Sequence, residues 1–433
     1  MHTKRRNHDF IQQSLNRPLV TAIIGPRRIG KSTFVQTYAQ QYSERTWVHL
    51  NMDVLQQKLD IEQGKLETLI IEQAQRHIGD GEKIWVSIDE AQKAPSLFEQ
   101  IKALYDRYKD HNKIKFIVTG SAVLNLHQLS AESLAGRVDL IHLQEFSLRE
   151  SADLLHKRVL PEARLLDHLQ NPLNTLEPLL HSYLPHQPVL TQTLETLLVW
   201  GGFPEVLQQE DAASKTRYLH NYLQTYLEKD VLAINTVSDL NLYHNLMQLL
   251  AEQTGSPRDD SKLKQALGCH LATLQKYRGF LSATLLYQDI YPHIYSSLKR
   301  LAKSPKGYLL NNGLISILTG LSDLPTLIKT GLVGHRFENW FLNELHTWQA
   351  RQAAPSAIHF WRTSDGREVD FIVKHQGQVI PFELTHQNTP DRKKERNLLT
   401  FLNDEPKATN GFIVYRGPFM VKGPIVYLPA WAI

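Results

Sequence analysis

Residues 19–32, which read LVTAIIGPRRIGKS, decide the fold of this chain. The first six of these residues are nearly all apolar and rich in β-branched side chains, a pattern that predicts a buried strand. The next eight match the pattern GxxxxGK[ST], in which glycines let backbone N–H groups wrap phosphates and the lysine reaches the β- and γ-phosphates. A helix is expected to begin at the lysine, where its dipole favours an anion. The stretch therefore predicts a nucleotide site after the first strand of a sheet.

This loop provides most of the candidate nucleotide contacts. The hydroxyl of Ser32 is expected to ligate Mg²⁺, and Lys31 is expected to act on the phosphates during catalysis. We therefore predict that ATP and Mg²⁺ are bound by Gly25, Pro26, Arg27, Arg28, Ile29, Gly30, Lys31, Ser32 and Thr33.

Residues 1–148 alternate apolar strands with segments of helical length. Strands are expected at 19–24, 46–50, 84–88, 114–118 and 140–143, and helices include 33–42 and 66–78. This alternation is typical of a parallel sheet with helices on both faces. We predict an α/β fold whose first domain, 1–148, is a P-loop ATPase core.

Two other strands of the core end in residues suited to phosphate cleavage. Asp89 and Glu90 follow the strand 84–88, where Asp89 suits an outer ligand of Mg²⁺ and Glu90 a base that polarises the attacking water. The hydroxyls of Thr119 and Ser121 follow the strand 114–118. If that strand lies between the two motif strands, either hydroxyl is expected to contact the γ-phosphate or the water.

Arg137 precedes the last predicted core strand, in the sequence SLAGR. An arginine at this place fits a finger donated to the ATP of a neighbouring subunit. The alternative is a structural ion pair within the chain. The first interpretation implies a homo-oligomer, such as a hexameric ring.

The similarity of the chain to a known family rests on seven motifs: GPRRIGKS (25–32), SIDEAQ (87–92), VTGS (118–121), SLAGR (133–137), GGFPE (201–205), KRLAKSPKGYLLNNGL (299–314) and GREVDF (366–371). Together they resemble the AAA+/STAND-type ATPases of bacteria and archaea that carry a C-terminal domain of unknown function. The resemblance implies that Pro204, in a Gly-x-Pro element, contacts the adenine. It also places Asn312 where the family usually has an aspartate.

After the core, residues 149–235 predict a helical lid, and residues 236–325 predict a winged helix. Helices at 262–267 and 270–281, joined by a turn at Gly268, form a helix-turn-helix pattern. In the second helix Leu271, Leu274, Arg278 and Leu281 share a face, and the apolar members, the three leucines, are expected to pack inward. The candidate DNA contacts on the same helix are His270, Thr273 and Lys276.

A basic segment points to the same partner. Residues 258–306 contain nine Lys or Arg and three Asp, whereas the whole chain has a net charge of only +4. The run from Lys299 to Lys306, between strands expected at 285–290 and 308–310, reads as a wing. Its Lys299, Arg300 and Lys303 are candidate phosphate contacts. The alternatives are a solvated basic face, or a winged helix that serves only as a lid or protein-interaction module.

Residues 326–433 predict a small α/β domain, with a helix at 335–345 and strands at 367–374 and 379–385. If Gln376-Gly377 is a two-residue hairpin loop, facing residues have numbers that sum to 753, and Asp370 faces Glu383. Carboxylates placed in this way repel unless a positive group lies between them, and a divalent cation is the natural candidate. Without a cation, neutralising Asp370 is expected to stabilise the domain.

This carboxylate face resembles the PD-(D/E)xK nuclease fold. The resemblance implies that Glu338 is the helix carboxylate, that Asp370 and Glu383 are metal ligands, and that a lysine follows two residues later. Thr385 stands there instead, and the lysines that could replace the missing one are Lys374, Lys393 and Lys394. A degenerate nuclease retained for binding is the preferred interpretation, and an active nuclease is the alternative.

The composition, with 42% hydrophobic and 21% charged residues, is that of an ordinary globular protein. No apolar run reaches the roughly 18–20 residues of a membrane span, no secretory signal is recognisable, and the one cysteine excludes an internal disulfide. We expect a cytoplasmic protein without a membrane partner. The predicted function is a Mg²⁺-dependent ATPase that couples ATP to DNA binding or remodelling as a homo-oligomer. The alternatives are a nucleotide-controlled regulatory or defence switch and an ATP-regulated DNA nuclease.

Overall fold

The computed structural model describes residues 8–120, 134–157, 160, 165–168, 176–226, 237–296, 300–301 and 303–433. The chain forms two compact units. The first is His2–Gln144, and the second consists of Glu145–Ser282 and Leu286–Ile433. The regions predicted as lid, winged helix and C-terminal domain thus belong to one unit. In the part of the chain that the structure describes, no helix is long and apolar enough to cross a membrane.

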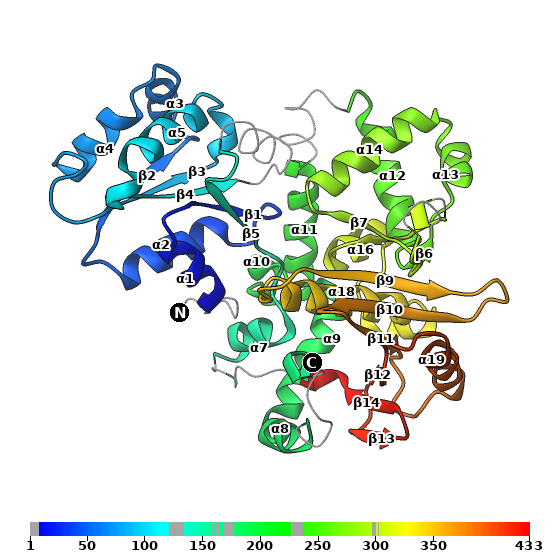
Figure 1. The fold of residues 1–433 in the computed structure, drawn as a ribbon. Coiled ribbons are helices and arrows are strands. Elements are labelled where there is room, and N and C mark those ends of the chain that lie inside the picture. Colours follow the sequence, from blue (N-terminus) through cyan, green and yellow to red (C-terminus); the bar gives the residue numbers. More distant parts are fainter. Residues whose placement is uncertain are drawn as a thin grey trace. The chain divides into compact units, whose positions relative to one another are not determined.

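The first unit is built on a five-stranded parallel sheet of order β2-β3-β4-β1-β5 (Figure 1). Its strands are β1 (Val20–Ile24), β2 (Thr46–Asn51), β3 (Ile84–Asp89), β4 (Ile114–Gly120) and β5 (Val138–His142). Its helices are α1 (His8–Asn16), α2 (Lys31–Gln41), α3 (Leu55–Glu62), α4 (Leu66–Ala74) and α5 (Leu97–Tyr108), with 3-10 turns η1 (Ala91–Lys93) and η2 (Lys109–His111). The prediction of a parallel α/β sheet is confirmed, and each predicted strand end lies within two residues of the observed one.

Burial explains why these segments pair as they do. Every residue of β1 and of β4 is buried, as expected for strands that are covered on both faces. Helix α5 presents Leu97, Ile101 and Leu104 to the core at the spacing of one helix face. Because β1, β3 and β4 pair in parallel, their carboxyl ends meet at one edge of the sheet, and that edge carries the predicted site.

The second unit begins with helices. They are α7 (Leu148–His156), η3 (Leu165–His168), α8 (Leu176–Tyr183), η5 (Leu184–His186), α9 (Gln187–Trp200), α10 (Pro204–Leu207) and α11 (Ala212–Tyr226). Ser147 and Glu150 form a capping box at the start of α7, which satisfies the free N–H groups of its first turn.

Three helices and a small antiparallel sheet of order β6-β8-β7 follow, as expected for a winged helix. The elements are α12 (Leu240–Glu252), β6 (Ser256–Pro257), α13 (Asp260–Leu267), α14 (Leu271–Ala283), β7 (Tyr287–Ile290) and β8 (Lys306–Leu309), and then α16 (Asn312–Thr319) and α17 (Leu324–Lys329). Gly268 makes the turn between α13 and α14 with φ 61°, a conformation that glycine adopts without strain.

The C-terminal region is a six-stranded sheet of order β13-β14-β12-β11-β10-β9. Its elements are α18 (Val333–Gln349), β9 (Ser356–Arg362), β10 (Glu368–His375), β11 (Gln378–Leu384), α19 (Arg392–Asp404), β12 (Gly411–Tyr415), β13 (Met420–Lys422), β14 (Ile425–Pro429) and η7 (Ala430–Ala432). Helix α18 packs Phe341 against Phe371, whereas α19 packs Leu398 on the side of Ile372. Because neighbouring residues of a strand point to opposite faces, the two helices cover opposite faces of this sheet.

The predicted hairpin register is confirmed. The paired residues of β10 and β11, from Phe371 with Phe382 to His375 with Gln378, all have numbers that sum to 753. An irregularity does occur between Val369 and Ile372, but it lies in the pairing of β10 with β9, on the other edge of β10.

Candidate functional site

The phosphate loop has two positions that require glycine, Gly25 and Gly30. A Cβ atom on Gly25 would lie 2.5 Å from the carbonyl oxygen of Leu143, so the loop passes directly over the backbone that follows β5. Gly30 has φ 92° and is the residue from which α2 starts. Arg28 also lies in the left-handed region, with φ 60°. These turns wrap the loop around the N-terminus of α2, where N–H groups point outward.

Lys31 is buried and lies within the loop itself. Its Nζ donates hydrogen bonds to the carbonyl oxygens of Gly25 and Pro26, at 3.0 and 2.8 Å. The ammonium therefore lies among the backbone groups of the predicted phosphate cradle. This position suits a lysine that exchanges carbonyl partners for phosphate oxygens.

Asp89 joins the three motif elements of the core. Its carboxylate accepts a hydrogen bond from Ser32 Oγ at 2.7 Å, and its other oxygen accepts one from Thr119 Oγ1. The sheet order makes this possible because β4 lies between β3 and β1. A hydroxyl beside a carboxylate at the N-terminus of α2 fits the oxygen ligands that Mg²⁺ takes in P-loop proteins. Ser121, the other predicted hydroxyl, lies outside the described residues.

Glu90 begins a tight turn directly after β3. Its φ is 52°, an uncommon conformation for a residue other than glycine and one that is concentrated at functional sites. Gln92 Nε2 donates to its carboxylate at 2.6 Å, and the Glu90 N–H donates to Asp89 at 3.1 Å. Sequence reasoning missed the role of Gln92, although the residue lies in the same motif, SIDEAQ. The carboxylate predicted to polarise water is thus held in place by its own turn.

Arg137 forms the ion pair that was the structural alternative. Its Nε and one of its terminal nitrogens reach the two oxygens of Asp106 at 2.9 and 3.0 Å. The pair lies at a partly exposed position of the first unit. The role of Arg137 as a finger toward another subunit stays a prediction.

Pro204 lies in the second unit, at the first position of α10, and is buried. The glycine before it serves packing, because a Cβ on Gly202 would lie 2.4 Å from the carbonyl oxygen of Phe146. The Gly202 N–H also donates to Glu145 at 3.1 Å. The contact of Pro204 with adenine stays a prediction.

Asn312 has a structural explanation. Its Nδ2 donates to the carbonyl oxygens of Leu197 and Arg336 at 3.2 and 3.0 Å, and its Oδ1 accepts from Asn339. An aspartate in this buried site would turn an oxygen toward two carbonyl oxygens. The amide therefore matches this packing better than the carboxylate expected from the resemblance.

The structure shows how exposed the candidate DNA contacts of the predicted second helix are, and their contact with DNA stays a prediction. His270, which directly precedes α14, and Lys276 are exposed and Thr273 is half-buried. Leu274 and Leu281 are buried as predicted, and Arg278 on the same face is buried as well. The prediction for Leu271 is wrong, because its side chain is 43% exposed. It lies at the first turn of α14, beyond the reach of the core that α12 and α13 provide.

The basic run of the wing is divided by the structure. Arg300 is half-buried and Lys303 is exposed, whereas Lys299 lies outside the described residues. Lys306, which the sequence placed in the same basic run, is buried and makes ion pairs with Glu368 and, at 3.7 Å, with Glu338. Its side chain thus points from β8 toward the C-terminal carboxylates.

Those carboxylates form a buried ionic cluster, and Lys394 of α19 lies at its centre. Lys394 Nζ donates to Asp370 at 2.9 Å and to Glu383 at 2.7 Å. The backbone N–H of Leu384 also donates to Asp370, at 2.8 Å, and Asn397 donates to Glu383 at 3.0 Å. Of the three candidate lysines, Lys394 is thus the one that contacts these carboxylates, as the lysine expected at position 385 would have done. Within the described ranges, no group of three or more His, Cys, Asp or Glu is arranged to hold a metal ion.

Burial and charge pull the pKa values of this cluster apart. Burial raises the pKa of Glu338 to about 7, against the opposing effect of Lys306. Burial would also raise the pKa of Asp370, but Lys394 and Lys306 outweigh it and lower that pKa to about 2. The pKa of Glu383 is raised by burial and then by Asp370. Like charges in one buried site oppose each other's ionisation, so Asp370 is the stronger acid of the pair and Glu383 the weaker.

Comparison with known families agrees with the first unit. Residues 17–152 match the family described as AAA domain. Residues 191–324 and 333–431 match two families described as domains of unknown function, DUF8612 and DUF4143. The phosphate loop, the strand order and the first match together define an AAA-type P-loop domain, the fold of nucleotide-hydrolysing ATPases.

Two relatives match most of the chain by sequence. Uncharacterized proteins of Mycobacterium tuberculosis and Mycobacterium bovis are each 24% identical over 422 residues, which cover 97% of this chain and 82% of theirs.

Solved structures with some similarity have low scores. One is PCH-2 of C. elegans, 18% identical with a TM-score of 0.25 over 35% of this chain and 42% of its own. Another is the Aeropyrum pernix ORC1 protein in complex with DNA, 11% identical with a TM-score of 0.30 over 76% of this chain and 95% of its own. The chain thus spans less than half of the PCH-2 structure.

Proposed function

We propose that this chain is a Mg²⁺-dependent ATPase that couples ATP binding and hydrolysis to DNA binding or remodelling as a homo-oligomer. The observation that carries the ATPase part is the position of Asp89, which accepts from Ser32 of the phosphate loop and from Thr119 of β4 while Glu90 follows it in a fixed turn. These are the parts that phosphoryl transfer needs, because its catalysis is mostly positioning and charge stabilisation.

Each of these residues has a distinct role in the proposal. Lys31 Nζ binds the β- and γ-phosphates in place of the loop carbonyls, and Ser32 and Asp89 hold Mg²⁺, which neutralises charge on the phosphates when bound. The Glu90 carboxylate orients the attacking water and accepts its proton. Gln92 keeps that carboxylate at the strand end.

The DNA part of the proposal rests on the basic segment, and the oligomer part rests on Arg137. The basic segment 258–306 supports a nucleic-acid partner, and its exposed candidates are His270, directly before α14, and Lys276 on α14. Arg137 supports an oligomer only if it leaves Asp106 for a neighbouring subunit. A mixture of Arg137→Ala and Lys31→Ala proteins should then regain part of the activity that each has lost, and mixed oligomers without any recovery would remove the finger from the proposal.

Steady-state ATP hydrolysis tests the core of the proposal. Lys31→Ala should abolish tight ATP binding, whereas Glu90→Gln should keep binding and lose turnover. Each protein is assayed without DNA and with single-stranded, duplex, forked or four-way DNA, because stimulation by DNA tests the coupling. Equal turnover of Glu90→Gln and wild type would exclude Glu90 as the base.

A second candidate function is an ATP-regulated DNA nuclease, and one observation favours it. Lys394 supplies a positive group between Asp370 and Glu383, which the sequence left without one. Cleavage of labelled DNA with Mg²⁺ or Mn²⁺ should then be lost in Lys394→Met and retained in Lys393→Met, whose lysine is exposed on the same helix. Wild type that cuts no DNA under these conditions would leave the cluster a structural role.

A further inference from the structure

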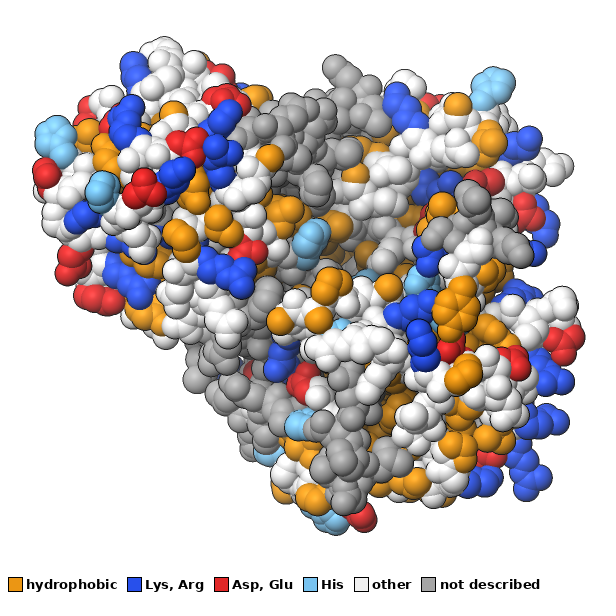
Figure 2. All heavy atoms as spheres, in the orientation of Figure 1, with side chains coloured by type: hydrophobic (Ala, Val, Ile, Leu, Met, Phe, Trp, Pro, Cys, Tyr) orange, Lys and Arg blue, Asp and Glu red, His pale blue; other side chains and the backbone are white. Residues whose placement is uncertain are grey.

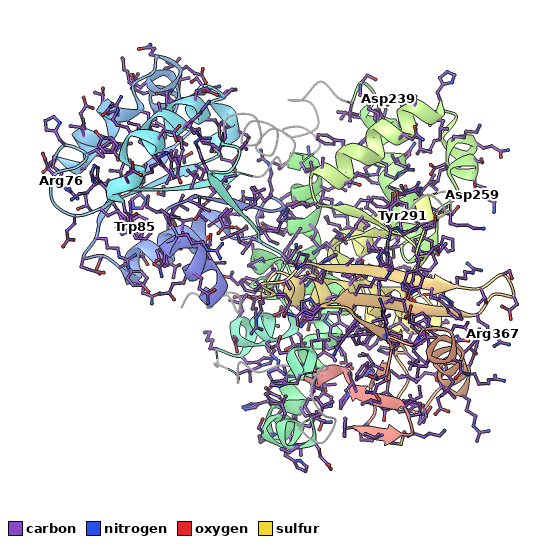
Figure 3. The ribbon with its side chains drawn as sticks, viewed as in Figure 1. Arg76, Trp85, Asp239, Asp259, Tyr291 and Arg367 are labelled. Carbon is purple, nitrogen blue, oxygen red and sulfur yellow. The ribbon has the colours of Figure 1, made fainter. Side chains whose placement is uncertain are left out.

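The segment that follows β7 is docked on the C-terminal sheet. Tyr291, labelled in Figure 3, accepts a backbone hydrogen bond from Phe360 of β9 at 3.3 Å, and His293 donates one back to Phe360 at 2.5 Å. Pro292 and Phe360 form a parallel bridge. The segment between β7 and the predicted wing is therefore continuous with β9.

Tyr295 stands out from this surface with its hydroxyl end fixed. Its hydroxyl donates to Glu405, with the two carboxylate oxygens at 2.8 and 2.6 Å, and His293 Nε2 lies 2.8 Å from the same carboxylate. The residue is nevertheless 68% exposed. An aromatic ring held at one end and open to solvent is a preorganised stacking platform, because little side-chain freedom remains to be lost on binding.

Three cationic residues lie near this ring. The N–H of Lys407 donates to Glu405 at 3.3 Å, and the N–H of Arg300 donates to the carbonyl oxygen of Ser296, the residue after Tyr295, at 2.9 Å. Lys374 Nζ of β10 lies 5.0 Å from the centre of the Tyr295 ring. Burial lowers the pKa of Lys374, and the charges of Arg300 and Lys407 lower it further, against the effect of Glu405. Burial also lowers the pKa of His359 to about 4, followed by the charge of Lys374 and, more weakly, that of Arg300. Arg300, Lys374 and Lys407 thus belong to one basic region, and Figure 2 shows Lys and Arg side chains gathered over β9 and β10.

We propose that Tyr295, Arg300, Lys374 and Lys407, here called the Tyr295 patch, bind single-stranded nucleic acid. A base stacks on the Tyr295 ring, and the three cations contact the phosphates on either side of it. Clustered cations around an exposed aromatic ring are the usual combination in single-strand sites. A duplex is less suitable, since its bases present their faces only to one another. The inference rests on the proposed nucleic-acid partner and names its surface and its form.

Fluorescence anisotropy of the intact chain without ATP tests this proposal. The probes are labelled oligo-dT and oligo-U of roughly 20 nucleotides, longer than the ~4–16 that one such site covers, and a duplex of equal length. Tyr295→Ala should weaken single-strand binding by roughly 5- to 150-fold, the equivalent of ~1–3 kcal/mol for one stacked base. Lys374→Gln should lower the slope of log affinity against log salt by about 0.7.

Two controls separate stacking from folding. Tyr295→Phe loses the hydroxyl that binds Glu405 but keeps the ring, so it should bind single strands nearly as wild type does. Lys329→Gln removes an exposed lysine of α17 and should leave the salt dependence unchanged. Three outcomes would each overturn the proposal. They are equal losses of affinity in Tyr295→Ala and Tyr295→Phe, tighter binding of the duplex that is unchanged in Tyr295→Ala, and no binding of either single strand by wild type.

The two probes and the ATP assay keep this inference apart from the proposed function. Preference for oligo-dT or oligo-U identifies the natural strand, and either supports the patch. Wild type that hydrolyses ATP but binds neither strand refutes the patch and leaves the ATPase. Binding through Tyr295 without any change in ATP turnover supports the patch and refutes the coupling.

Discussion

Replacing Lys394 with methionine tests whether the C-terminal cluster is held together by this one ammonium. Methionine keeps the length and the apolar stem of the side chain but removes its charge. Lys394 donates to Asp370 and to Glu383, and both carboxylates are buried. In the variant, two facing carboxylates lose the positive group between them.

The size of the effect follows from burial. Removing one partner of a buried ion pair costs about 3–5 kcal/mol, because the remaining charge stays desolvated. Without the ammonium, the pKa of Asp370 in the folded state is expected to rise from its present value of about 2 to above the unfolded value. The folded variant then binds a proton that the unfolded chain releases, and its stability falls as pH increases. The deficit relative to wild type should therefore widen from pH 5 to pH 8, by up to ~1.4 kcal/mol for each pH unit.

Urea unfolding followed at several pH values measures this deficit, and Lys393→Met is the matched control. Lys393 precedes Lys394 on α19, but its side chain is exposed. The control should change stability by less than about 0.5 kcal/mol at every pH, as surface substitutions usually do. A Lys394→Met protein as stable as the control at pH 8, or with a deficit independent of pH, would refute the reasoning.

Three further predictions concern other parts of the chain. Burial raises the pKa of Glu338 to about 7, so between pH 4.5 and 7 the folded wild type holds a proton that the unfolded chain has released, and wild type loses about 3 kcal/mol of stability over this range. Glu338→Gln should remove this loss. Parallel stability profiles of the variant and wild type would contradict the prediction. Thr119→Val should lower ATP turnover by roughly 10- to 100-fold, the value of a hydrogen bond to the charged Asp89, and wild-type turnover would separate this hydroxyl from catalysis. Gly202→Ala should lower the melting temperature of the second unit, because the new Cβ would meet the Phe146 carbonyl, and an unchanged melting temperature would show that this backbone yields freely.

The structure also reverses one expectation for the carboxylate pair. From the register alone, neutralising Asp370 was expected to relieve repulsion and to stabilise the domain. Asp370 instead accepts hydrogen bonds from Lys394 and from the Leu384 backbone. Asp370→Asn should therefore destabilise the domain, since it breaks charge-assisted bonds in a buried site.

Local patterns in the sequence predicted the core well. The loop 25–32 and the strand 84–88 carry their information within a few residues, because backbone geometry and chemistry coincide there. The hairpin register was equally accessible, since a two-residue loop fixes which residues face each other. What these features share is that each is determined by neighbours in the chain.

The features that the sequence could not predict depend on distant contacts. Nothing near Lys394 distinguishes it from Lys393, and only the docking of α19 selects the one that reaches Asp370. The burial of Lys306 was equally hard to predict, because its basic neighbours suggest an exposed wing, whereas β8 places its side chain in the interior. The net charge of a sequence segment does not tell whether a given side chain points to solvent or to the interior.

The position of Lys306 has a consequence for inheritance. It lies in the region that matches one family, whereas its partners Glu338 and Glu368 lie in the region that matches the next. A chimaera that joined either region to an unrelated neighbour would leave Lys306 buried without its counter-charges, or would take from Glu338 and Glu368 the lysine that they share. We therefore expect recombination to transmit the two regions together, as one physical piece under two family descriptions.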